Sequence, residues 1–121
     1  MASSPYLTIV TQRHGQEILL CVQGELDVSN RDSLREAIDG LLEPSPQTLV
    51  LDLSGLSFAD CASLSILVSA HQHLAEQGRK LILLDAQPLV RRLLAVTGLD
   101  RVFHLSDSGT EEDNPPIEAP A

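Results

Sequence analysis

Short hydrophobic runs bounded by polar residues recur along the chain and predict strands. The first two, at residues 6–12 and 17–23, are separated by His14 and Gly15, a polar link typical of an antiparallel hairpin. Three later runs predict further strands at 49–53, 81–84 and 102–105.

The segments between these runs carry apolar residues at helical spacing and predict three helices. The positions expected to face inward are Leu34, Ala37, Ile38, Leu41 and Leu42 in the first helix, Leu64, Leu67, Val68, His71, Leu74 and Ala75 in the second, and Leu89, Leu93 and Val96 in the third. Because helices and strands alternate after the hairpin, we expect parallel strands joined by right-handed crossovers. The predicted fold class is therefore α/β with a mixed sheet.

Residues suited to helix ends flank each predicted helix. Those expected at the starts are Ser29 with Asp32 as a capping pair, Asp60 as the N-cap of a helix beginning at Cys61, and Pro88 at a first helical position. Those expected to end the helices are Pro44 with Pro46, Gly78 and Gly98.

The composition fits one compact domain, which we place at residues 6–106 of the 121. Hydrophobic residues make up 43% of the chain and aromatic residues 2%, so the core must be aliphatic. A formal net charge of −9 repels phosphate groups and argues against a nucleic-acid or anionic-membrane partner. Residues 108–121 combine acids and prolines with little apolar surface, so we expect them to form a disordered tail.

The sequence shows neither a secretory signal nor an apolar stretch near the roughly 20 residues that span a bilayer. Two cysteines, Cys21 and Cys61, are too few for a disulfide scaffold. We therefore expect a cytoplasmic protein without direct membrane insertion, in which Cys21 is a small core residue.

The residues argue against a catalytic, cofactor or metal site. The glycines are scattered and form no phosphate-binding loop. His71 and His73 lie two apart on a predicted helix and point about 200° apart, so they cannot readily share a metal. A helix start would favour a Cys61 thiolate, but the adjoining Asp60 disfavours it and no base lies nearby in sequence. We expect no enzyme activity.

Two acidic segments are expected to meet at one edge of the sheet. Residues 24–27 leave one predicted strand and end in Asp27, and residues 53–60 leave the next and end in Asp60. If these strands are parallel, both segments emerge at the edge where open α/β sheets form sites. The alternative is that each aspartate only caps a helix.

In these segments the chain resembles the STAS domain, and within it the stand-alone bacterial anti-sigma-factor antagonists. The resemblance covers about residues 6–106. It rests on residues 24–27 (GELD), 49–54 (LVLDLS), 56–58 (LSF), 60–64 (DCASL), 90–94 (VRRLL) and 97–99 (TGL).

This resemblance implies about five strands with helices mainly on one face, and no catalytic activity. It implies partner switching, in which the protein binds an anti-sigma factor of the histidine-kinase-like ATPase type and frees a sigma factor for transcription. The implied partner-binding residues are Asp27, Asp60, Cys61 and Ser63. Homodimer formation is left open.

The chain departs from the family pattern at the position that the partner kinase phosphorylates. The usual Asp-Ser-Ser-Gly-Leu is replaced by residues 60–64, so the thiol of Cys61 stands at the phosphoacceptor position. Three modes of control follow: an antagonist that is always competent to bind, phosphorylation displaced to Ser63 or Ser57, or reversible oxidation of Cys61. A different function on the same fold also stays open, a soluble accessory subunit that scaffolds a transporter or a stress-signalling assembly.

Overall fold

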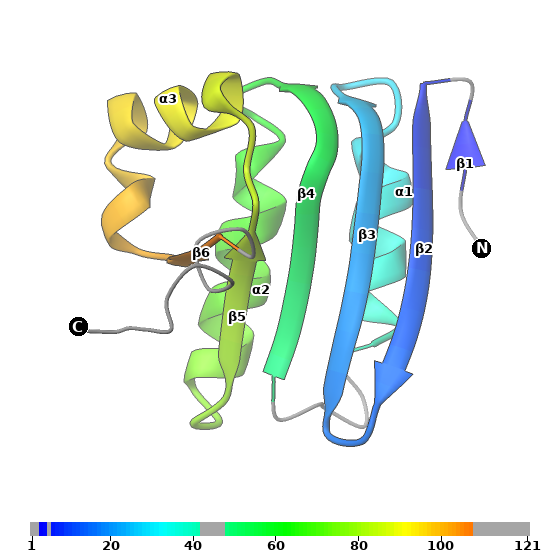
Figure 1. Cartoon of the computed structure of the whole chain (residues 1–121), viewed down its shortest axis with the longest axis vertical. Helices are drawn as coiled ribbons and strands as arrows, with labels where there is room; N and C mark the ends of the chain where they lie inside the picture. The colour runs from blue at the N-terminus through cyan, green and yellow to red at the C-terminus, as the bar shows by residue number, and fades with distance from the viewer. Residues whose placement is uncertain (1–2, 5, 42–47, 108–121) are drawn as a thin grey trace.

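The computed structural model describes residues 3–4, 6–41 and 48–107. One sheet with the strand order β1-β2-β3-β4-β5-β6 carries three helices (Figure 1). The strands are β1 (Ser3–Ser4), β2 (Leu7–His14), β3 (Glu17–Leu26), β4 (Thr48–Ala59), β5 (Lys80–Leu84) and β6 (His104–Ser106). The helices are α1 (Arg31–Asp39), α2 (Leu64–Ala75), α3 (Pro88–Thr97) and the short 3-10 helix η1 (Leu99–Arg101).

The sheet is mixed, as predicted. Strands β1, β2 and β3 pair antiparallel, whereas β3, β4, β5 and β6 pair parallel. The five predicted strands correspond to β2–β6, and the two-residue β1 adds an edge strand. The predicted hairpin is also present: His14 pairs with Glu17 across a turn in which Gly15 has a φ of 63°, a conformation that glycine adopts at little cost.

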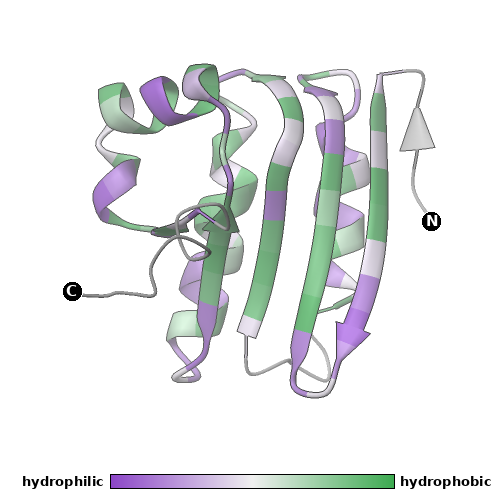
Figure 2. Cartoon of the chain, in the orientation of Figure 1, coloured by the Kyte–Doolittle hydropathy of each residue, from purple (hydrophilic) through white to green (hydrophobic). Residues whose placement is uncertain are grey.

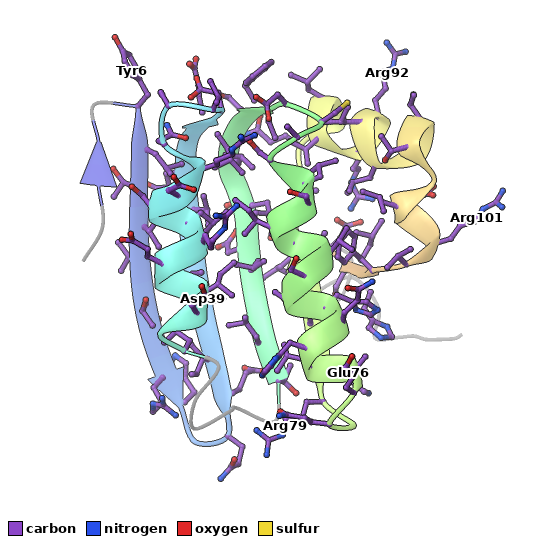
Figure 3. The ribbon with its side chains drawn as sticks, turned by 180° about the vertical axis from the view of Figure 1, so that it is seen from behind. Tyr6, Asp39, Glu76, Arg79, Arg92 and Arg101 are labelled. Atoms are coloured by element: carbon purple, nitrogen blue, oxygen red, sulfur yellow. The ribbon has the colours of Figure 1, made fainter. Side chains whose placement is uncertain are left out.

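Helices α1 and α2 cover one face of the sheet, and α3 lies across one end (Figures 1 and 3). Aliphatic side chains fill the space between the layers. Leu20, Leu51 and Leu83 are register partners on β3, β4 and β5 and are fully buried, and Figure 2 shows hydrophobic residues concentrated on these strands. Each such side chain contributes roughly 1.5–3 kcal/mol by leaving water.

Strand β4 is longer than predicted. Residues 54–59, expected to leave the strand and lead to the next helix, continue the strand to Ala59. They do so because β3 also extends, to Leu26, and supplies hydrogen-bonding partners across two register shifts. Long-range pairing here outweighs the local turn signals.

Several predictions about the helices need correction. In α2, Ala75 is exposed, and Ile66 and Ala70 are buried instead. In α3 the inward face is offset by one residue: Val90 and Leu94 are buried, Leu93 is partly buried, and Leu89 and Val96 are exposed. This helix carries apolar residues on two sides, so spacing alone could not identify the inner one.

The helix ends agree with prediction only in part. Pro88 is the first residue of α3, and Gly98 ends it in the left-handed conformation, as expected. The capping pair Ser29 and Asp32 is wrong: the residue before α1 is Asn30, and Ser29 donates to Asp27 instead. Helix α2 runs to Ala75 and closes through a turn in which Gly78 has a φ of 72° and the Arg79 N–H donates to the Leu74 carbonyl at 2.8 Å, so Gly78 ends the helix as expected.

Some predictions fall outside the described residues. Leu42, Pro44 and Pro46 lie within residues 42–47, and the tail prediction concerns residues 108–121. In the part of the chain that the structure describes, no helix has the length and apolar character needed to cross a membrane.

Candidate functional site

Asp27 and Asp60 occupy neighbouring positions at one end of the sheet. The last residues of β3 and β4, Leu26 and Ala59, are register partners, and each aspartate follows directly. The backbone N–H of Asp60 donates to the carbonyl of Leu26 at 3.2 Å, so the two chains are still hydrogen-bonded where they leave the sheet. The structure thus brings the two carboxylate-bearing residues to one edge, as the sequence predicted, and leaves both half-buried.

Side-chain hydrogen bonds hold the Asp27 turn in one conformation. The Asp27 Oδ1 accepts from the backbone N–H of Ser29 at 2.9 Å and from its hydroxyl at 2.6 Å. The buried Asn30 side chain accepts from the Asp27 N–H at 3.0 Å and donates to the Glu25 carbonyl at 2.9 Å. The backbone position of Asp27 is therefore preorganised rather than left to a mobile loop.

Asp60 holds the second turn in a similar way. Its Oδ1 accepts from the backbone N–H of Ser63 at 2.8 Å, which is the predicted capping bond. The α-helix itself begins at Leu64, three residues later than predicted, because residues 61–63 form a turn first. The Ser63 side chain and its N–H, helped by the positive charge of Arg31, lower the pKa of Asp60 below its ordinary value.

The other predicted site residues have different environments. Cys61 is exposed beside Asp60. Ser57 is also exposed, and its hydroxyl donates to the Gly24 carbonyl at 3.1 Å, which ties β4 to β3. Ser63 differs from expectation: it has 0% of its surface exposed, so its hydroxyl lies beneath the edge and not on it. The turn would have to open before Ser63 could contact a partner or accept phosphate.

Exposed apolar side chains lie among these polar groups, and sequence reasoning missed them. Val28, directly after Asp27, is 69% exposed, and Phe58, two residues before Asp60, is 41% exposed. Tyr6 lies at the same end of the sheet (Figure 3). The signal was available for Val28 and Phe58, because both are large apolar residues outside the predicted strands and helix faces, whereas Tyr6 was expected to begin the first strand. Apolar side chains set among charged ones are typical of protein-binding surfaces.

Two other candidate residues have structural partners. The His71 ring packs edge-to-face against Phe103, with ring centroids 5.8 Å apart. Cys21 is not the core residue we expected: it lies partly buried on the sheet face opposite the helices, and its Sγ lies 3.8 Å from a carboxylate oxygen of Asp52. Burial and the Asp52 charge raise the pKa of the Cys21 thiol, which keeps it protonated.

The sequence and the fold of this chain are similar to those of known proteins. The chain matches the STAS domain model over residues 8–111. The anti-sigma-F factor antagonist RsfB of Mycobacterium tuberculosis is 29% identical over 105 residues, which cover 87% of this chain and 85% of that protein. A crystal structure of an anti-sigma factor antagonist from Mycobacterium paratuberculosis has 30% identity and a TM-score of 0.78, covering 87% of this chain and 90% of the other.

Fold likeness extends to more distant proteins. The anti-sigma factor antagonist SpoIIAA in its unphosphorylated form has a TM-score of 0.74 at 21% identity, covering 87% of this chain and 90% of that one. The observed mixed sheet, its helical layer and the family match over residues 8–111 agree with one another. The chain belongs to the STAS domain family.

Proposed function

We propose that this chain is an anti-sigma-factor antagonist that binds a kinase-type anti-sigma factor through the edge containing Asp27 and Asp60, and so frees a sigma factor for transcription. The observation that carries the proposal is the pair of preorganised, half-buried aspartates that follow the register partners Leu26 and Ala59. Several relatives of this chain are named as antagonists of anti-sigma factors, which supports the proposal.

The charge and rigidity of the edge suit it to docking. Hydrogen bonds within each turn fix both carboxylates before binding, which lowers the ordering cost of association. Negative charge next to exposed Val28 and Phe58 selects a partner with a basic side chain among apolar ones. The edge is thus suited to a protein surface that presents basic side chains among apolar ones.

The presence of Cys61 is the reason for the mode by which we propose that partner binding is controlled. The thiol occupies the phosphoacceptor position of the family, where a Ser/Thr kinase cannot phosphorylate it in the ordinary way. The displaced alternative at Ser63 is disfavoured by its complete burial, whereas Ser57 and the Cys61 thiol itself are exposed. We propose that the edge is always competent to bind and that abundance or competition sets its activity.

Binding to the kinase-type anti-sigma factors of the source organism, measured by calorimetry with each purified protein, tests the function. Asp27→Asn keeps the acceptor oxygen that Ser29 uses but removes the charge, so we expect roughly tenfold weaker binding, about 1.4 kcal/mol, with nearly unchanged thermal stability. Asp39→Asn is the matched control, because Asp39 is exposed at the far end of α1 (Figure 3).

Two results would contradict the proposal. Equal binding by wild type and Asp27→Asn would remove Asp27 from the interface. Absence of binding to every kinase-type anti-sigma factor, together with tight binding to a transport ATPase, would favour the accessory-subunit alternative.

A further inference from the structure

Helix α3 presents a second stripe to solvent, turned by roughly 100° about the helix axis from the one that packs on the core. Leu89, Arg92 and Val96 are spaced three and four residues apart, so they lie on one face of the helix. Leu89 is 51% exposed and Val96 is 78% exposed. We call these three residues the outer stripe. Val90 and Leu94 already fill the inner face, so the outer stripe contributes little to the core.

The basic residue of the outer stripe is distinct from its neighbour in sequence. Arg91 is partly exposed and held by partners: its Nε donates to the Ala86 carbonyl at 3.0 Å and its guanidinium pairs with Asp107. Arg92 is exposed and points away from the molecule (Figure 3). Arg91 therefore anchors the helix, whereas Arg92 is available at the surface.

The outer stripe lies at the same end of the sheet as the two aspartates. The Gln87 side chain, directly before α3, donates to the Ser54 carbonyl of β4 at 2.6 Å, which holds the start of the helix near β4. Figure 1 shows α3 beside the end of β4, on the side of β5, and Figure 3 shows Arg92 and Tyr6 projecting from this end of the molecule on opposite sides. From Leu89 to Val96 the stripe extends about 10 Å along the helix.

We propose that the outer stripe is part of the docking surface for the anti-sigma factor and contacts the same bound partner as Asp27 and Asp60. This inference rests on the proposed function and adds a second contact region to it. The partner should present apolar side chains to Leu89 and Val96, and an acidic side chain to Arg92.

Charge and apolar character together support one continuous surface. The carboxylates of Asp27 and Asp60 lie where β3 and β4 end, with Arg31 near Asp60, and Arg92 adds an exposed positive charge on α3. Opposite charges on two sides of a surface fix the orientation in which a partner can dock. Phe58 of β4 and Leu89 of α3 add exposed apolar side chains to these charged ones, a combination typical of protein interfaces.

A protein fits this surface better than a membrane does. The chain has a formal net charge of −9, and the outer stripe has one basic residue. An amphipathic helix that lies on anionic lipid usually carries several Lys or Arg on its polar face. Binding of wild type to anionic vesicles that is lost in the stripe variants would overturn the inference.

The test uses the double variant Leu89→Gln and Val96→Gln in the full chain. Glutamine is a good helix former, and both sites are exposed, so the melting temperature should be nearly unchanged. We expect the calorimetric affinity for the kinase-type anti-sigma factor to fall at least tenfold. Arg92→Glu should also weaken binding, and more so at low salt, because it reverses a charge.

Val10→Gln is the matched control. Val10 is 42% exposed on β2, on the sheet face opposite the helices. The Val10→Gln variant should therefore bind the anti-sigma factor with wild-type affinity. Wild-type affinity in the double variant, with weakened binding by Asp27→Asn, would overturn the inference and leave the proposed function standing. A wild-type chain that binds no kinase-type anti-sigma factor would overturn both.

Discussion

At the scale of single residues, Asp60 serves two roles with one side chain. Its Oδ1 caps the turn that leads into α2, and its charge lies at the edge where we propose that a partner docks. A loss of binding in an Asp60 variant would therefore combine a folding effect with an interface effect. Asp27 can be separated more cleanly, because asparagine preserves the acceptor that its turn requires.

The capping role of Asp60 predicts a pH-dependent stability difference. Because the folded-state pKa of Asp60 lies below its ordinary value of 3.8, the charged carboxylate adds stability above that pH and loses it as the pH falls through the folded value. Asp60→Ala should cost about 1 kcal/mol at pH 7. Urea unfolding followed by circular dichroism should show a smaller difference at pH 3; an undiminished one would mean that the charge is not involved.

At the scale of elements, the edge that contains Asp27 and Asp60 lies directly after the ends of two long paired strands. Strands β3 and β4 stay paired to Leu26 and Ala59, although the register shifts twice along the way. Gly24 makes the second shift possible. It has a φ of 112°, and a Cβ at this position would lie 2.0 Å from the backbone oxygen of Tyr6.

Gly24→Ala should therefore be one of the more destabilising substitutions in the chain. The left-handed backbone and the clash with fixed backbone atoms should together cost on the order of 1–3 kcal/mol or more. Gly40→Ala is the control, because Gly40 has a φ of −68° and a Cβ there would make only ordinary contact, 3.5 Å from the Glu36 carbonyl oxygen. Free energies of unfolding from urea titrations should separate the two, and equal costs would contradict the account.

At the scale of the whole molecule, the fold brings four separate segments together at the end where we propose that a partner docks. Residues before β2, after β3, at the end of β4 and in α3 lie at the same end of the sheet (Figures 1 and 3). Parallel pairing of β3, β4 and β5 causes this, since it brings the carboxyl ends of these strands together. A partner bound there would contact parts of the chain far apart in sequence.

The Cys61 position gives a prediction about the complex. If the partner is a kinase, Cys61→Ser should restore a phosphoacceptor at an exposed site beside Asp60. Incubation with the partner and ATP should add one phosphoryl group to the variant and none to wild type, as measured by intact mass. Phosphate beside Asp60 should then weaken binding, because it adds roughly −1.5 to −2 charge. An unmodified variant would show that the partner is not of the kinase kind.

Local sequence signals were enough to predict the hairpin, the alternation of helices and strands, the start of α3 at Pro88 and its end at Gly98. They also located Asp27 and Asp60 at a shared edge. These features depend on hydrophobic period, turn chemistry and capping, which act between residues close in the chain.

Other features arise from contacts between residues far apart in the chain. The length of β4 depends on β3 extending beside it. The inner face of α3 could not be chosen from spacing, because Leu89 and Val90 both begin apolar stripes, and only packing against the sheet selects Val90. Ser63 lies under the edge because the Asp60 turn folds over it. These three features depend on which side chains become buried when the core assembles. Short stretches of sequence do not carry that information.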